Sequence, residues 1–178
     1  MLDSLLHNCK TAWSEVKDNK KHPFRFFYLA TIGNDGRPSL RTVVLRDFDS
    51  ETLFFSIFTD LRSKKVKELG QDSRAQFLFY DAKKMLQVTV NVSLVESINN
   101  DLIYKSIPEQ SKKDYATKMV PGSEISSPGK VEYDFSKGYF TQLVFKAETI
   151  EYLQLKRPNH IRAFFTSETN WEGTFLIP

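Results

Sequence analysis

The expected fold depends most on the stretch Arg37-Pro-Ser-Leu-Arg-Thr-Val-Val-Leu-Arg46 and on the segment from Leu53 to Gly70 that follows it. The β-branched and apolar residues 42–45 are typical of a β-strand, and the turn-forming residues 34–38 come directly before them. The aromatic and β-branched run 52–58 predicts a second strand. The stretch therefore predicts consecutive strands joined by short turns.

A short helix is expected after the second strand. Thr59 or Asp60 is its predicted N-cap, and Gly70 is its predicted end. The first turn of this helix, Leu61-Arg-Ser-Lys-Lys65, is basic, although the partial positive charge of a helix N-terminus favours acidic side chains.

This basic turn has two interpretations. It is either an exposed, solvated surface or a site where the unpaired N–H groups and the cations bind an anion, most often a phosphate. Arg41 and Arg46 on the preceding strand are candidates for forked hydrogen bonds to the same anion. Because these two residues are five apart, a regular strand directs them to opposite faces. A bulge, a strand end or a backbone contact is needed to bring both to one ligand.

The rest of the chain is predicted to be mostly strands with a few helices. The expected helices cover residues 3–20, 99–106 and 109–119, and a loop rich in Pro, Gly and Ser covers 120–130. The further expected strands are 24–32, 74–80, 85–96, 139–145, 148–155, 161–167 and 174–177. Short strands at this spacing predict a mainly β fold, an antiparallel barrel with flanking helices. We expect one domain over residues 1–178, with an N-terminal helix.

Composition narrows the class of protein. The chain has 178 residues, 40% hydrophobic content and 15 Phe, which suits a compact β-rich domain. A net charge of +3 selects no partner, and most aromatics lie in strand patterns, so a nucleic-acid partner is not expected. One cysteine, Cys9, fits a cytoplasmic location, and no apolar run approaches the ~18 residues of a membrane-spanning helix. With only three histidines, we expect no metal site.

Several segments, in order and at similar spacing over about 70 residues, resemble the pyridoxamine 5'-phosphate oxidase-like FMN-binding proteins. They are Leu29-Ala-Thr-Ile-Gly-Asn-Asp-Gly-Arg-Pro-Ser39, Arg41-Thr-Val-Val-Leu-Arg46, Phe58-Thr-Asp-Leu-Arg-Ser-Lys-Lys-Val-Lys-Glu-Leu69, Phe77-Leu-Phe-Tyr80 and Gln87-Val88. The resemblance implies a split β-barrel that forms a homodimer, with FMN between the subunits. It also implies an oxidoreductase whose substrate the sequence does not name.

The resemblance implies roles for individual residues. Arg41 and Lys64 would bind the FMN phosphate, Arg46 would lie near the flavin ring in place of the family's usual Lys, and Gln87 and Arg162 would contact the ring. The full set of implied cofactor-binding residues is Arg41, Thr42, Val44, Arg46, Phe58, Thr59, Ser63, Lys64, Lys65, Gln87 and Arg162.

Departures from the family concern the substrate. Ile107 replaces an Arg that holds the substrate phosphate in oxidase members, Leu153 replaces a flavin-stacking Trp, and Pro158-Asn-His160 keeps only the His of an Arg–Leu–His triplet. His160 is therefore a candidate catalytic residue, although a lone His is more often structural. Two alternatives stay open: a genuine pyridoxamine 5'-phosphate oxidase, and an FMN carrier or sensor without catalytic activity.

Overall fold

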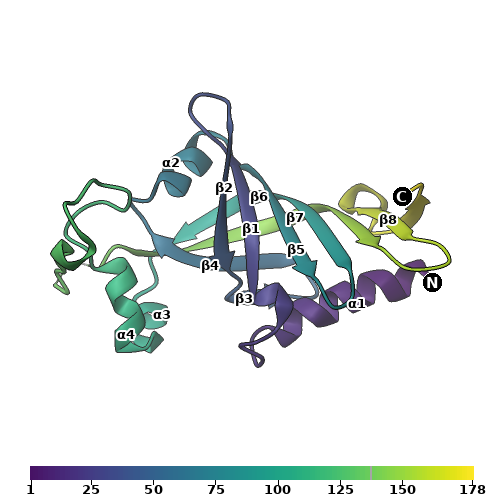
Figure 1. The fold of residues 1–178 in the computed structure, drawn as a ribbon, viewed down its shortest axis with the longest axis horizontal. Coiled ribbons are helices and arrows are strands. Elements are labelled where there is room, and N and C mark those ends of the chain that lie inside the picture. Colours follow the sequence, from purple (N-terminus) through teal and green to yellow (C-terminus); the bar gives the residue numbers. More distant parts are fainter. Residues whose placement is uncertain (137) are drawn as a thin grey trace.

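The computed structural model describes residues 1–136 and 138–178, and its main element is a nine-stranded antiparallel sheet (Figure 1). The strands follow the order β2-β1-β5-β6-β7-β4-β3, with β8 paired to β7 and β9 paired to β8. The sheet curls around a core but does not close, so the fold is the expected mainly β, split-barrel class. The strands are β1 (Phe26–Ile32), β2 (Pro38–Val44), β3 (Asp47–Asp49), β4 (Phe54–Asp60), β5 (Arg74–Asp81), β6 (Leu86–Ile98), β7 (Phe140–Gln154), β8 (Ile161–Thr166) and β9 (Gly173–Leu176).

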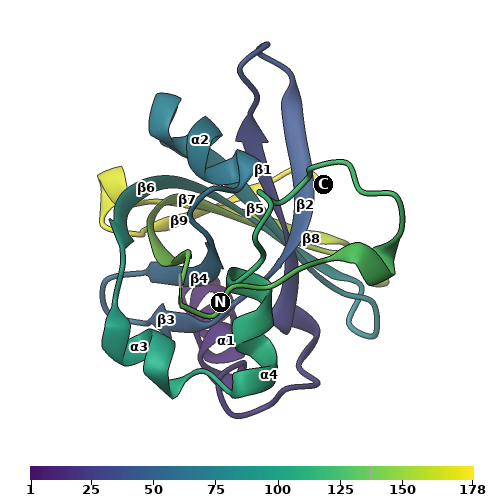
Figure 2. The same cartoon turned by 90° about the vertical axis from the view of Figure 1, so that its left-hand side faces the viewer.

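Over the described ranges 1–136 and 138–178, four α-helices lie around the sheet. α2, α3 and α4 are at one end of the molecule, whereas α1, β8 and both termini are at the other (Figures 1 and 2). Their bounds are α1 (Leu2–Glu15), α2 (Lys64–Gln71), α3 (Asp101–Ser106) and α4 (Glu109–Lys112). Short 3-10 turns cover Pro23–Arg25, Lys113–Tyr115, Pro128–Lys130 and Ser167–Thr169.

Two expected helices are shorter than predicted. The first ends at Glu15 rather than at residue 20, because the charged residues that follow have no apolar face to pack and form a turn instead. The expected helix 109–119 ends at Lys112 and continues as a single 3-10 turn. Thr117 then forms an isolated β-bridge with Tyr133, which fixes the chain in an extended conformation.

The two strands expected at 139–145 and 148–155 are one continuous strand, β7. β7 pairs with β6 along almost its whole length, with two register shifts: between Asn91 and Val92 of β6 the extra residue is Glu148 of β7, and between Leu94 and Glu96 it is Val95 of β6. The break expected between the two strands is therefore a local irregularity at Glu148, and the pairing continues past it.

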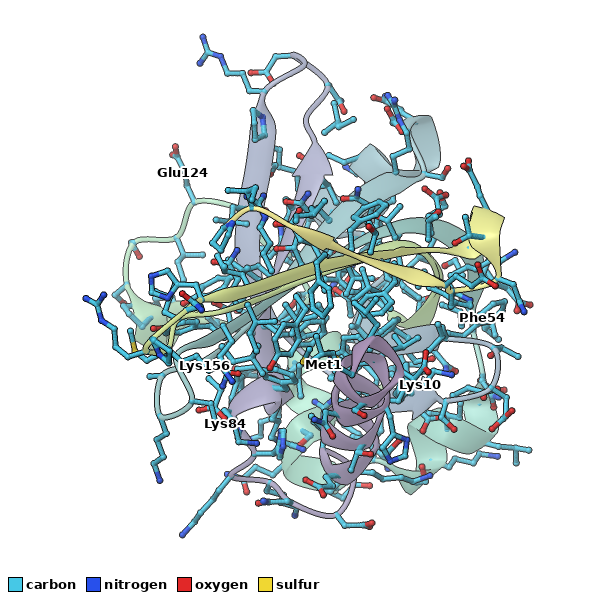
Figure 3. All side chains as sticks on the ribbon, turned by 90° about the vertical axis from the view of Figure 1, so that its right-hand side faces the viewer. Met1, Lys10, Phe54, Lys84, Glu124 and Lys156 are labelled. Atoms are coloured by element: carbon cyan, nitrogen blue, oxygen red, sulfur yellow. The ribbon has the colours of Figure 1, made fainter. Side chains whose placement is uncertain are left out.

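An aromatic core lies between α1 and the sheet. Trp13 of α1 is almost fully buried and packs against Phe48, Phe55 and Phe79, with ring centroids 5.0–5.6 Å apart. Figure 3 views this helix from the end at which Met1 lies and shows side chains filling the space above it. In β6 the even-numbered residues from Leu86 to Val92 are buried, because side chains along a strand point alternately to its two faces.

Candidate functional site: a donor cluster at the start of α2

β4 continues through Asp60, and α2 begins only at Lys64 with Ser63 as its N-cap. The prediction that Thr59 or Asp60 caps the helix is therefore wrong, and so is the predicted stop at Gly70, because α2 runs on to Gln71. Asp60 remains in the strand because it pairs with Phe140 of β7 and its carboxylate binds Arg62, with an Nη2–Oδ2 distance of 2.6 Å.

Three donors converge where β4 meets α2. The ammonium nitrogen Nζ of Lys65 lies 2.9 Å from Oγ1 of Thr59 and 3.4 Å from Oγ of Ser63, and the two hydroxyl oxygens are 3.3 Å apart. We call Thr59, Ser63 and Lys65 the donor cluster. Thr59 and Ser63 are buried, and the Ser63 side chain does not cap α2. The first N–H groups of the helix are therefore left without a side-chain cap beside these donors.

The charge of the donor cluster is only partly compensated, by the carboxylates of Asp60 and Glu68. Burial lowers the pKa of Lys65, and the neighbouring positive charge of Arg41 lowers it further. A protonated Lys65 thus carries a free-energy cost in the folded chain. An anion bound by these donors would offset that cost.

Arg41 lies beside the cluster but is already fully engaged. Its Nη1 donates to the Leu29 carbonyl at 3.2 Å and to Thr31 Oγ1 at 2.5 Å, and its Nη2 donates to Ser39 Oγ at 2.7 Å and to Glu68 Oε2 at 2.8 Å. Arg41 shares the strand parity of the buried Leu45, so it faces the inside of the barrel. Both of its terminal nitrogens therefore donate hydrogen bonds to acceptors of the protein itself.

Glu68 is a residue of this site that sequence reasoning missed. Its side chain is only 1% exposed, and its Oε2 accepts a hydrogen bond from Thr31 at 2.6 Å besides that from Arg41. The only sequence signal was its spacing of four from Lys64, which is typical of an ordinary surface pair on a helix. Burial by itself raises the pKa of Glu68, but polar interactions with Thr31, Arg41, Ser39 and Lys64 outweigh it, and the net direction is downward.

Arg46 lies beyond the end of β2, so the alternation of the strand does not fix the direction of its side chain relative to Arg41. β2 ends at Val44, and the Arg46 backbone N–H donates to the Ser56 carbonyl of β4 at 2.9 Å. Its guanidinium carbon lies 5.4 Å from the centroid of the Phe58 ring. Among the described residues its buried Nε has no hydrogen-bond partner. A small cluster of Ile107, Tyr115 and Phe140 packs against Phe58 and makes this side of the site apolar and aromatic.

The other predicted cofactor residues lie on a different surface. Thr42 and Val44 have the strand parity opposite to Arg41 and so face outward from β2. Gln87 of β6 pairs with Leu153 of β7, which pairs with Arg162 of β8, so these three side chains share one face.

Two predicted residues make local contacts there. Arg162 forms an ion pair with Glu151 at 2.9 Å. The candidate catalytic residue His160 is exposed, and its Nδ1 accepts the backbone N–H of Lys156 at 3.1 Å. His160 therefore stabilises the turn before β8 through this hydrogen bond, and it does not reach the donor cluster of its own chain.

The two groups of predicted residues are far apart within one chain. Thr59 pairs with Thr141, and Gln87 pairs with Leu153, both on β7. These partners are twelve residues apart, or about 40 Å along a strand at ~3.3 Å per residue. Figure 1 likewise places α2 and β8 at opposite ends of the molecule. One chain thus brings together the predicted phosphate ligands but not the predicted ring ligands Gln87 and Arg162.

The arrangement defines a class of protein: a split barrel with a cationic donor cluster for a phosphate-bearing ligand. Two buried hydroxyls, an ammonium group and an uncapped helix N-terminus fit a phosphate. The orphaned Nε of Arg46, beside an aromatic wall, fits a polar planar group next to that phosphate. The residues present therefore fit a flavin mononucleotide.

Comparison with known proteins names the family. The model of the pyridoxamine 5'-phosphate oxidase FMN-binding domain matches residues 7–94. The chain is 30% identical over 165 residues to a pyridoxine/pyridoxamine 5'-phosphate oxidase 2 of Arabidopsis thaliana, which covers 83% of this chain and 81% of the relative. The chain belongs to the pyridoxamine 5'-phosphate oxidase-like FMN-binding family, and FMN is the cofactor of that domain.

Other relatives match over a shorter part. A pyridoxine/pyridoxamine 5'-phosphate oxidase of Cupriavidus pinatubonensis is 31% identical over 111 residues, 59% of this chain, and the match spans 51% of the relative, about half its length. Among solved structures, a pyridoxamine 5'-phosphate oxidase-related, FMN-binding protein of Nostoc punctiforme aligns with a TM-score of 0.77 at 20% identity, over 94% of this chain and 95% of that one.

PhzG of Burkholderia lata, solved with tetrahydrophenazine-1-carboxylic acid, aligns with a TM-score of 0.75 at 18% identity, covering 96% of this chain and 91% of the other. These two structural matches establish the shared fold. In the part of the chain that the structure describes, no helix is long and apolar enough to cross a membrane.

Proposed function

We propose that this protein is an FMN-dependent oxidoreductase that works as a homodimer. The observation that carries the proposal is the donor cluster, where the Lys65 ammonium group lies within hydrogen-bond distance of the Thr59 and Ser63 hydroxyls at the uncapped start of α2. These donors would hold the FMN phosphate. Lys64, exposed at the first position of the helix, would add charge at the rim.

A second chain would complete each site. One FMN cannot reach both Thr59 and Gln87 of a single chain, because they are separated by most of the length of β7. The outer face of β1 and β2 is unusually apolar for a free surface, with Phe26, Tyr28 and Leu40 exposed by 59%, 45% and 66%. Packing this face against a second copy would bury it and would bring a partner's ring-binding side chains to the flavin.

The chain's own residues would orient the flavin and adjust its environment. FMN supplies hydride or electron transfer at its ring when bound. Arg46, held by its backbone bond to Ser56 and free at Nε, would place a positive charge beside the ring. The Ile107, Tyr115 and Phe140 cluster would exclude water from the same side.

Pyridoxamine 5'-phosphate is the first substrate to test, because the curated relatives are named for it. Ile107 argues against efficient turnover of that substrate. It is 9% exposed and packed among aromatic rings, so this position offers no charge to a substrate phosphate. We expect turnover of a different substrate to exceed that of pyridoxamine 5'-phosphate.

We also propose that the protein works in the cytoplasm and that residues 1–178 form one domain. The single cysteine, Cys9, is free and buried, which suits the reducing cytoplasm. We treat residues 1–178 as one FMN-binding unit, built on one continuous sheet with α1 against its core.

A flavin titration of the purified protein tests the cofactor. FMN should bind with characteristic quenching of flavin fluorescence, and riboflavin, which lacks the phosphate, should bind at least tenfold more weakly, or about 1.4 kcal/mol. Equal affinity for the two flavins would refute the phosphate site. Reduction of the bound flavin by NADH or NADPH, followed by reoxidation in air, would then separate an oxidoreductase from a carrier or sensor.

Sedimentation of the same preparation tests the dimer. The wild type should sediment as a dimer, and Tyr28→Glu should yield monomers with weakened FMN binding. Lys10→Glu in α1, a helix that contacts β3 and β9, is the matched control and should remain dimeric. A wild-type monomer with full FMN affinity would contradict the shared site.

A further inference from the structure

Glu68 is a buried carboxylate placed among the cations of the proposed phosphate site. It is 1% exposed and lies at the centre of contacts from three elements: α2 itself, Thr31 of β1 and Arg41 of β2. Its Oε2 accepts from Thr31 at 2.6 Å and from Arg41 at 2.8 Å, whereas Oε1 lies 3.4 Å from Nζ of Lys64. Within the described residues, Oε1 has no hydrogen bond.

The surroundings of Glu68 make it the counter-ion of a cationic group. Arg41, Lys64 and Lys65 are close enough that Arg41 lowers the pKa of Lys65, while Glu68 acts in the opposite direction. Asp60 also raises the pKa of Lys65, but its carboxylate is already paired with Arg62 at 2.6 Å. Glu68 is the buried carboxylate that forms ion pairs with Arg41 and Lys64 and also favours the protonated form of Lys65.

We propose that Glu68 is an internal counter-ion that sets the charge of the phosphate site and competes with the ligand phosphate for the same cations. Three positive side chains and one carboxylate leave a net charge of +2. A phosphate monoester carries about −1.5 to −2 at neutral pH. The site with Glu68 ionised therefore matches a dianionic monoester such as that of FMN, and it stays folded when no anion is bound.

This inference rests on the proposed function, since it takes FMN as the ligand. It separates two roles that one residue could have. As a structural anchor, Glu68 would only tie α2 to the sheet, and any change would weaken every flavin alike. As a counter-ion, its charge matters separately from its shape, and only the ligand's phosphate is affected.

Glu68→Gln isolates the charge, because glutamine keeps an oxygen that can accept from Thr31 or Arg41. We expect the melting temperature without ligand to fall, since Arg41, Lys64 and Lys65 then repel one another without compensation. The FMN Kd should decrease about fivefold, the effect of about 1 kcal/mol between charges in a water-like dielectric. The riboflavin Kd should stay unchanged.

Two further variants complete the set. Glu68→Asp keeps the charge and should bind FMN as the wild type does. Glu51→Gln removes an exposed carboxylate from the turn before β4 and is the matched control. If Glu68→Gln is not folded in chloride buffer, inorganic phosphate at equal ionic strength should restore its melting transition, because phosphate replaces the missing counter-ion.

The outcomes are distinct. Equal weakening of FMN and riboflavin by Glu68→Gln would reduce Glu68 to a structural anchor, and selective weakening of FMN, or no change at all, would likewise overturn the counter-ion role. A variant that stays unfolded in phosphate as in chloride would also overturn it. A wild type that does not prefer FMN to riboflavin would refute the proposed function itself, whatever the variants do.

Discussion

Lys65→Met gives the sharpest test of the donor cluster. The substitution removes the ammonium group that lies 2.9 Å from the Thr59 hydroxyl and keeps a flexible apolar side chain of similar length. A charge-assisted hydrogen bond to a phosphate contributes about 1.5–3 kcal/mol, so the FMN Kd should rise roughly 10- to 150-fold. The riboflavin Kd should not change, because riboflavin has no phosphate for Lys65 to hold.

The stability of the unliganded protein should move differently from its affinity. The pKa of Lys65 is lowered by burial and then by Arg41, so the folded chain favours the neutral amine. The protonated amine is therefore a cost to folding that is relieved as the pH rises through the lowered pKa of Lys65. Methionine removes this cost, and we expect the melting temperature without ligand to stay level or increase.

Fluorescence titration with FMN and riboflavin, together with thermal melting, measures both effects. Lys67→Met is the matched control, because Lys67 lies on the same helix but is exposed and outside the cluster. It should leave both affinities unchanged. Unchanged FMN affinity in Lys65→Met, or an equal loss of FMN and riboflavin affinity, would refute the assignment of Lys65 to the phosphate.

Three further outcomes are expected. Because an anion favours protonated Lys65, wild-type FMN affinity should fall as the pH rises through the pKa of this residue, which is lowered from 10.5. Lys65→Met should lack that step in a series of FMN titrations at increasing pH. Identical profiles for the two proteins would contradict the reasoning. Arg62→Ala should lower the free energy of unfolding by about 3 kcal/mol, measured in a denaturant titration. The substitution leaves the buried Asp60 without its ion pair and removes a 2.8 Å hydrogen bond to the Thr117 carbonyl. A loss below ~1 kcal/mol would contradict this prediction. Burial raises the pKa of the Cys9 thiol to about 12. A thiol reagent at neutral pH should therefore modify Cys9 only as fast as the protein unfolds. Rapid labelling of the native protein would contradict the burial of Cys9 in the core.

Local patterns in the sequence determined most of the strand structure and the place of the basic donor cluster. The alternation from Leu86 to Val92 encodes one buried and one polar face whatever the neighbours are, and the core residues follow it. The basic residues 61–65 predicted an anion site at the start of α2, and this stays a prediction. They did so because unpaired N–H groups and cations at a helix start are local features.

Only the tertiary structure decided where each of the basic residues lies and which partner it binds. Arg62, expected in the first helical turn, lies outside α2 because Asp60, held in β4, binds it. Arg41, expected as a phosphate ligand, faces inward and is held by Glu68. Nothing local marks Glu68 as buried, since its burial depends on how α2 lies against β1 and β2.

The distance between the donor cluster and Gln87 is also a property of the fold alone. The sequence lists Thr59 and Gln87 as members of one set, and their distance in the chain says little about their distance in space. β7 is one unbroken strand, and it pairs with β4 near one end and with the start of β6 near the other. The length of β7 became clear only from the pairing of β6 along it. That length is the physical reason that Thr59 and Gln87 of one chain lie far apart.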